Sequence, residues 1–179
     1  MPAVICMLRG VNLGNRRMKM DALRAMCEEL GFENPRTYVQ SGNVVFETKE
    51  GNVAKLTKRI EDAIQKKFSF HSDTVLRTAK EMKEAIARNP FAGRKDVVPG
   101  KLLVVFLSGD PGAELKKVIA GIREVPEEVV LNGHEIFIYF PNGQARPKLK
   151  FAVIDRALKV SWTGRNLNTV MALAKMASD

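Results

Sequence analysis

The nine residues from Arg9 to Arg17 combine two glycines, two asparagines and three arginines with no acidic residue. Glycine allows the backbone to approach a ligand closely, and arginine supplies positive charge and paired hydrogen-bond donors for a phosphate group. The stretch follows an apolar run at 4–8 and precedes a helix-like run at 20–30. Backbone amides at the start of a helix also attract anions. The residues therefore predict an anion-binding loop that opens a helix.

A second polar segment, Ser41-Gly42-Asn43, connects two predicted strands at 36–40 and 43–47. In a strand-helix-strand unit the two strands run parallel, because the helix forms a right-handed crossover. The loop after the first strand and the turn after the second should then lie at the same edge of the sheet. We expect guanidinium groups, glycine amides, a hydroxyl and side-chain amides to meet there.

Each part of this site also has a plain structural interpretation. Gly10 and Gly14 would be needed only for positive φ, and Asn12 would bond its own backbone. Ser41-Gly42-Asn43 would be an ordinary tight turn. The loop matches neither the phosphate-binding loop of nucleotide hydrolases nor the dinucleotide-binding glycine pattern, because no Gly-Lys-Ser/Thr follows and the glycines are wrongly spaced.

The net charge of +9 is concentrated in two segments. Residues 1–19 carry four cationic residues and no acid, and residues 144–166 carry six against one acid. The second segment ends near Arg165, which we expect at the start of the last helix with Asn166 as its N-cap. A cation there opposes the helix dipole and calls for an anionic partner. The candidate ligand-binding residues are Arg9, Gly10, Asn12, Gly14, Arg16, Lys19, Ser41, Gly42, Asn43, Arg165, Asn166 and Thr169.

Hydrophobic periodicity predicts two similar sets of elements. The first set comprises a strand at 3–9, a helix at 20–30, strands at 36–40 and 43–47, a helix at 53–68 and a strand at 73–77. A helical connector near 79–89 follows. The second set comprises a strand at 101–107, a helix at 113–122, strands at 128–132 and 135–140, a helix at 148–158, a strand at 159–163 and a last helix at 167–177.

These orders predict an α+β fold of two tandem ferredoxin-like βαββαβ units with antiparallel sheets. The expected division is a first subdomain at 1–78, a connector and linker at 79–100, and a second subdomain with a C-terminal helix at 101–179. Strands 4–8 and 102–107 are apolar without alternation, which predicts that both faces of each sheet are covered.

Several of these segments resemble a bacterial family, number 1697 among the domains of unknown function. The matching segments are 8–14, 20–32, 36–46, Pro141-Asn142-Gly143 and 165–170. The resemblance implies a duplicated ferredoxin-like organisation and no particular activity. This chain departs from the family at Pro147, Gly164 and Leu167, where serine, threonine and tryptophan are typical.

Other chemistry finds little support in the sequence. No apolar run is long enough to cross a membrane, and the N-terminus has a strand pattern rather than that of a signal peptide. Cys6 and Cys27 fit buried positions, which favours a reduced, cytoplasmic location. His71 and His134 are isolated in the sequence, so we expect no metal site, no cofactor and no serine-histidine catalytic system.

The leading hypothesis is a cytoplasmic protein that binds an anionic, phosphate-bearing small molecule at the Gly/Arg/Asn loop. One alternative is sequence-nonspecific nucleic-acid binding through phosphate contacts. Phe137 and Tyr139 could instead stack bases, but we interpret them as core residues, so the basic loops are the better candidates for nucleic-acid contacts. A second alternative is an enzyme acting on a phosphorylated metabolite, for which the sequence offers no evident proton-transfer group. The oligomeric state is not readable from the sequence.

Overall fold

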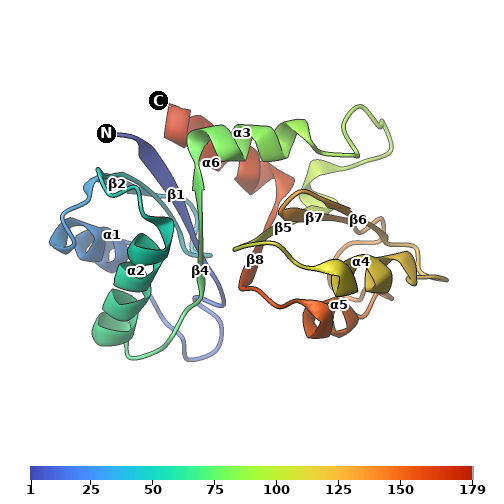
Figure 1. Cartoon of the computed structure of the whole chain (residues 1–179), viewed down its shortest axis with the longest axis horizontal. Helices are drawn as coiled ribbons and strands as arrows, with labels where there is room; N and C mark the ends of the chain where they lie inside the picture. The colour runs from blue at the N-terminus through green and yellow to red at the C-terminus, as the bar shows by residue number, and fades with distance from the viewer. Residues whose placement is uncertain (179) are drawn as a thin grey trace. The chain divides into compact units, whose positions relative to one another are not determined.

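The computed structural model describes residues 1–178, which form two compact units (Figure 1). The first unit contains Met1–Glu84 together with the chain from Met171 onward, and the second contains Ala85–Val170. The units therefore differ from the expected subdomains, because 85–100 belongs to the second unit and the end of the last helix belongs to the first.

The first unit is built on a four-stranded antiparallel sheet with the strand order β2-β3-β1-β4. Its elements are β1 (Ala3–Leu8), α1 (Met20–Glu29), β2 (Glu33–Thr37), β3 (Asn43–Glu47), α2 (Val53–Phe68) and β4 (Thr74–Thr78). Central β1 pairs with both β3 and β4, so that Cys6 lies opposite Val44 on one side and Leu76 on the other. Strands β1 and β2 run parallel, because each is antiparallel to β3. The loop after β1 and the β2–β3 turn therefore lie at one edge of the sheet, as the crossover argument predicted.

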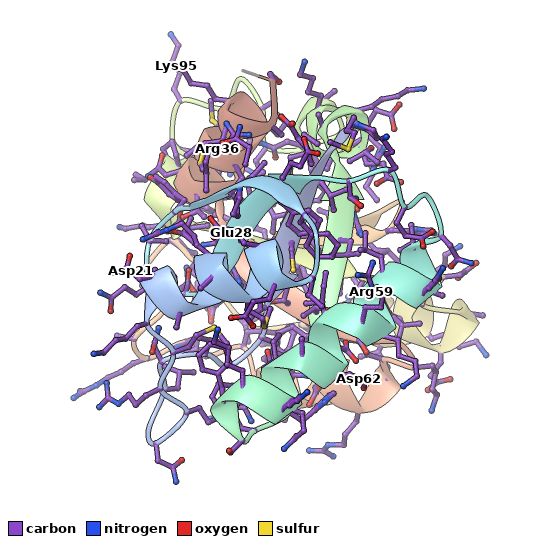
Figure 2. All side chains as sticks on the ribbon, turned by 90° about the vertical axis from the view of Figure 1, so that its left-hand side faces the viewer. Asp21, Glu28, Arg36, Arg59, Asp62 and Lys95 are labelled. Carbon is purple, nitrogen blue, oxygen red and sulfur yellow. The ribbon has the colours of Figure 1, made fainter. Side chains whose placement is uncertain are left out.

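Helices α1 and α2 cover one face of this sheet, and Figure 2 shows them side by side in front of the strands. Helix α2 forms because Leu56, Ile60 and Ile64 recur at helical spacing and are all buried. At its start the Asn52 side chain accepts a 3.0 Å hydrogen bond from the Lys55 amide, and it ends at Ser69 in the left-handed conformation. The packed aromatic rings of Phe32 and Phe46, 4.2 Å apart, lie in the same core.

The second unit repeats the arrangement with the strand order β6-β7-β5-β8. Helix α3 (Ala79–Ala87) crosses the boundary between the units, and α6 crosses it again. The remaining elements are a short 3₁₀ helix η1 (Pro99–Lys101), β5 (Leu102–Leu107), α4 (Ala113–Ala120), β6 (Glu128–Asn132), β7 (Glu135–Tyr139), α5 (Phe151–Ala157), β8 (Trp162–Asn166) and α6 (Leu167–Ser178). Helices α4 and α5 cover one face of its sheet around Leu115, Ile138 and Ile154.

Both central strands are buried on both faces, as their unbroken apolar sequences predicted. In β1 the residues from Val4 to Leu8 are all buried, and in β5 so are those from Val104 to Leu107. Phe137 and Tyr139 are 1% and 4% exposed. Both residues belong to the core, so their rings offer no exposed surface on which nucleic-acid bases could stack.

Two strands lie several residues away from their predicted positions. The strand expected at 36–40 is β2 at Glu33–Thr37, an edge strand that tolerates Pro35 and an irregular register between Glu33 and Arg36. The strand expected at 159–163 is β8, because pairing with Leu103–Leu107 draws a polar Gly-Arg-Asn stretch into the sheet. Tertiary pairing overrides local polarity in both cases.

None of the helices in the described part of the chain combines the length and apolar character needed to cross a membrane. Cys6 and Cys27 are both buried thiols. Burial raises the pKa of the Cys27 thiol to about 12, so this sulfur stays protonated at neutral pH.

Candidate functional site

Asn12 joins the β1–α1 loop to the β2–β3 turn. Its Nδ2 donates to the Gln40 carbonyl at 2.7 Å and to the Met18 carbonyl at 3.0 Å, while its Oδ1 accepts from the Met18 amide at 2.8 Å. The backbone of Asn12 has φ of +59°, which asparagine adopts more readily than most residues. The loop and the turn therefore meet as expected, and the Asn12 amide group is used in holding them together.

Arg16 holds the loop against the segment that precedes β4. Its Nε donates to the Gly10 carbonyl at 2.8 Å and its Nη2 donates to the His71 carbonyl. The guanidinium also lies over the Phe70 ring, 4.8 Å from the centroid. This arginine, one of the candidate ligand-binding residues, is thus largely engaged in building the loop.

The β2–β3 turn is shaped by Gly42 and closed by Asn43. Gly42 has φ of +86°, and a Cβ on it would lie 2.9 Å from the Leu8 Cβ, so only glycine fits. Buried Asn43 donates from Nδ2 to the Tyr38 carbonyl and to the Ser41 hydroxyl, both at 2.9 Å. Val39, half exposed, has φ of +50°, an uncommon and strained conformation for a β-branched residue. The turn is therefore a closely packed, strained support beside the loop.

The exposed cations of the loop lie just before α1. Arg17 and Lys19 are exposed, and Lys19 is the N-cap residue of α1, with no side-chain hydrogen bond that caps the helix. Arg9 is partly exposed, with Nη1 3.9 Å from Asp73 Oδ2. Gly10 and Gly14 have φ of +70° and +60°, so both need the freedom of glycine. An uncapped helix start preceded by cations is the part of the predicted site best suited to an anion.

The three remaining candidates lie in the second unit. Arg165 is a buried residue of β8, not an exposed residue at a helix start, and its Nη1 donates to Thr163 Oγ1 and to the Gly164 carbonyl, both at 2.8 Å. Asn166 Oδ1 accepts a 3.0 Å hydrogen bond from the Thr169 amide at the start of α6. This is the N-cap geometry expected for Asn166. These hydrogen bonds of the Arg165 and Asn166 side chains thus lie within the second unit.

Sequence reasoning missed a cluster formed by Glu61, His71 and Asp73. One ligand atom from each residue lies within 4.8 Å of those of the other two. His71 Nε2 is 2.7 Å from Asp73 Oδ1, and Glu61 Oε1 accepts from the Thr74 amide at 3.0 Å. Helix α2 supplies Glu61 and the segment before β4 supplies the other two, so His71 is isolated only along the sequence.

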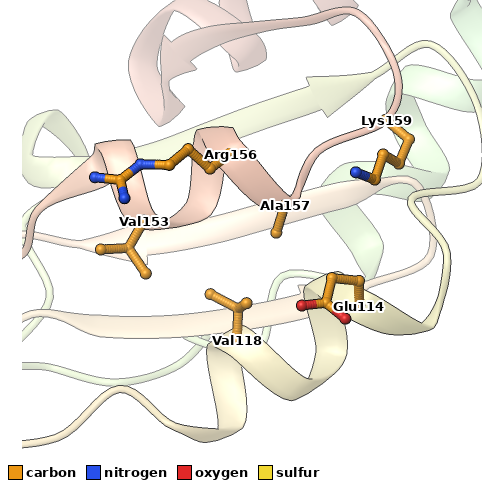
Figure 3. Close-up of a pocket in the computed structure, with 6 residues that line it drawn as sticks. All are labelled: Glu114, Val118, Val153, Arg156, Ala157 and Lys159. Atoms are coloured by element: carbon orange, nitrogen blue, oxygen red, sulfur yellow. The ribbon is translucent and has the colours of Figure 1, made fainter.

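The second unit has a shallow groove of about 390 Å³ between α4 and α5 (Figure 3). Apolar side chains and three charged side chains line it, namely Val118, Val153, Ala157, Glu114, Arg156 and Lys159. Its charged groups are of both signs and lie on exposed residues. The groove lacks a buried polar group that would orient a ligand.

Comparison with curated proteins gave no match. Among solved structures, a conserved bacterial protein, SP0830 from Streptococcus pneumoniae, is similar, with a TM-score of 0.75 and 20% sequence identity over 100% of this chain and 99% of that one. At this identity the likeness concerns the fold. A family model described as a protein of unknown function (DUF1697) matches residues 1–137. The chain belongs to this family.

Proposed function

We propose that the first unit binds an anionic, phosphate-bearing small molecule at the N-terminus of α1 and the loop before it. The observation that carries the proposal is the Lys19 N-cap, which leaves the start of α1 without a side-chain cap. The amide groups of a first helical turn have no partner within the helix, and the dipole there favours negative charge. The Lys19 side chain is positively charged, and a positive charge at this end of the helix is unfavourable until an anion binds.

The surrounding charges support an external anion. Arg17 and Lys19 are exposed, and neither forms an ion pair within the described residues. Asp21 in the first turn is 91% exposed and pairs with Arg24. Charges of this kind each contribute about 0.3–1 kcal/mol near a helix end. An anion bound there would gain from the dipole, from two cations and from the glycine-rich backbone.

The proposed contacts differ in kind among the candidate residues. Lys19 and Arg17, an exposed cation outside the predicted set, would supply charge, and Arg9 would extend the site. Gly14, whose Cβ position is open, would permit close backbone approach, whereas the Arg16 guanidinium covers that position on Gly10. Asn12, Arg16, Ser41, Gly42 and Asn43 would act as the rigid support, because their groups are already engaged in the loop and the turn. The second-unit candidates Arg165, Asn166 and Thr169 have no part in this proposal.

The test compares two double variants that remove the same charge. The first combines Arg17→Ala with Lys19→Ala. The matched control combines Lys49→Ala with Lys66→Ala, which replaces two exposed lysines elsewhere in the first unit. Pyrophosphate binding is measured by titration calorimetry at fixed low ionic strength, with thermal unfolding recorded for each protein. We expect at least a tenfold weaker affinity in the first variant and little change in the control. Equal weakening in both variants, or no binding by the unmodified protein, would overturn the proposal.

The nucleic-acid alternative is separated by a second ligand. A single-stranded oligonucleotide of mixed sequence is titrated at two salt concentrations. Nonspecific binding through phosphates falls steeply with salt and depends on total positive charge. If both double variants weaken oligonucleotide binding equally while pyrophosphate does not bind, the nucleic-acid alternative replaces the small-molecule proposal.

Two broader inferences accompany this function. We infer a ferredoxin-like arrangement for each unit, supported by the βαββαβ order and by β1 and β5 at the centre of their sheets. We also infer a cytoplasmic location, supported by the two buried thiols.

A further inference from the structure

We propose that Glu61, His71 and Asp73 form a binding site for a divalent transition-metal ion of the zinc type. The three ligand atoms lie within 4.8 Å of one another. In a tetrahedral zinc site with bonds of about 2.0–2.1 Å, neighbouring ligand atoms are about 3.3 Å apart. Small side-chain rotations therefore bring all three atoms to coordination distance.

The backbone around His71 and Asp73 is fixed by the β1–α1 loop. The Arg9 amide donates to the Asp73 carbonyl at 2.9 Å, and Arg16 donates to the His71 carbonyl. Between them Ser72 is fully buried, and its hydroxyl donates to the Arg9 carbonyl at 2.8 Å. His71 is exposed and Asp73 partly exposed on either side of this anchor. The two ligands are thus held on a rigid segment, which reduces the entropy lost when an ion binds.

Glu61 is oriented by a residue that does not contact the ion. Its Oε1 accepts hydrogen bonds from the Thr74 amide at 3.0 Å and from Thr74 Oγ1 at 3.3 Å. Thr74 is buried, so this support is well shielded from water. Outer partners of this kind orient metal ligands and strengthen binding.

The ligand set selects the kind of ion. One imidazole nitrogen with two carboxylate oxygens suits Zn²⁺, Co²⁺ or Mn²⁺ better than Ca²⁺ or Mg²⁺, which prefer oxygen alone. His71 Nε2 and Asp73 Oδ1 lie at hydrogen-bond distance, and the ion would take the place of the shared proton. Three protein ligands leave at least one coordination position open to water or to a bound group.

This proposal does not depend on the anion site, and its test needs no anion. The full chain is titrated with Co²⁺ by visible absorption, and with Zn²⁺ by calorimetry, in a buffer without phosphate. His71→Ala is compared with His134→Ala, the matched control, because these are the two histidines of the chain. We expect binding of about one ion per chain, at least a tenfold loss of affinity in His71→Ala, and unchanged binding in His134→Ala.

Two conservative variants test the site even if His71→Ala does not fold. Glu61→Gln retains an oxygen acceptor for Thr74, and Asp73→Asn is nearly the same size as the original residue. Circular dichroism checks that each variant is folded. Folded Glu61→Gln and Asp73→Asn proteins should bind Co²⁺ at least tenfold more weakly. Binding that survives in His71→Ala, or that is lost in His134→Ala, or that fails in the unmodified protein at millimolar Co²⁺, would overturn the proposal.

Discussion

Replacing Gly42 by alanine should destabilise the first unit through a collision that no side-chain rotation can relieve. The added Cβ would lie 2.9 Å from the Leu8 Cβ and 3.4 Å from two carbons of Val11. The position of a Cβ is fixed by the backbone, so side-chain rotation cannot move it. Leu8 cannot move away easily either, because its amide donates a hydrogen bond to the Gly42 carbonyl at 2.9 Å. Relief would require the β2–β3 turn to move away from β1.

The magnitude follows from two contributions, and Gly14 allows them to be separated. Both glycines have positive φ, which costs about 1–2 kcal/mol for a residue with a Cβ. Overpacking in a close-fitting region adds about 1–3 kcal/mol. A Cβ on Gly14 would meet nothing within 4 Å, so Gly14→Ala carries the backbone cost alone. We therefore expect Gly42→Ala to lower the free energy of unfolding by about 2–5 kcal/mol, and Gly14→Ala by about 1–2 kcal/mol.

The assay is urea unfolding of both variants and the unmodified protein, followed by far-ultraviolet circular dichroism. Fluorescence alone would be misleading, because Trp162, the single tryptophan, lies in the second unit. The two units can unfold in separate steps, so the transition is fitted for one step and for two. If Gly42→Ala and Gly14→Ala unfold at the same urea concentration, the loop is not packed as described and the reasoning is refuted.

Three further predictions concern other groups of the molecule. Thr74→Val removes the hydroxyl that orients Glu61, so Co²⁺ affinity should fall by about 10-fold while the fold persists, and an unchanged titration would contradict this. With its pKa raised to about 12, Cys27 should have a thiolate fraction of about 10⁻⁴ at pH 8, so a disulfide reagent should label it only after denaturation. The Arg94 guanidinium, through its hydrogen bonds, holds the pKa of the Asp96 carboxyl below its ordinary value of 3.8. A lowered pKa contributes stability above pH 3.8 that is lost as pH falls through the folded-state value, so Asp96→Asn should make the acid-side decline in the urea midpoint shallower.

Local patterns were sufficient where the chain buries one regular stripe of apolar residues. The helix at 53–68 was predicted to the residue, because Leu56, Ile60 and Ile64 leave little choice of face. The strand at 43–47, a short apolar run after a turn, was also predicted to the residue. Patterns failed at β2 and β8, which are edge strands made largely of polar residues. The position of such a polar strand is set by its partner rather than by its own sequence, so no local rule could place either one.

The candidate site likewise has a part that could be predicted from the sequence and a part that could not. The meeting of the loop with the β2–β3 turn could be predicted, because it follows from the direction of two strands. The roles of Asn12 and Arg16 could not, since an amide or a guanidinium that binds a ligand has the same sequence signature as one that binds a backbone carbonyl. Only the hydrogen-bond partners in the structure show that both side chains hold the loop in place.

The cluster around His71 was inaccessible to sequence reasoning for a different reason. Glu61 precedes His71 by ten positions, and the end of α2 lies between them. Recognisable metal motifs instead place their ligands at short, regular spacings. What brings Glu61 to His71 is the return of the chain from α2 into β4, and what fixes His71 is Arg16 in the first loop. The loop thus supports two neighbouring features, because its backbone holds the metal-ligand candidates while its exposed cations precede α1. Arg9 Nη1 lies 3.9 Å from Asp73 Oδ2, so one candidate residue of the anion site is next to a candidate metal ligand. A phosphate group that contacts both Arg9 and an ion on Asp73 would balance the positive charge of each.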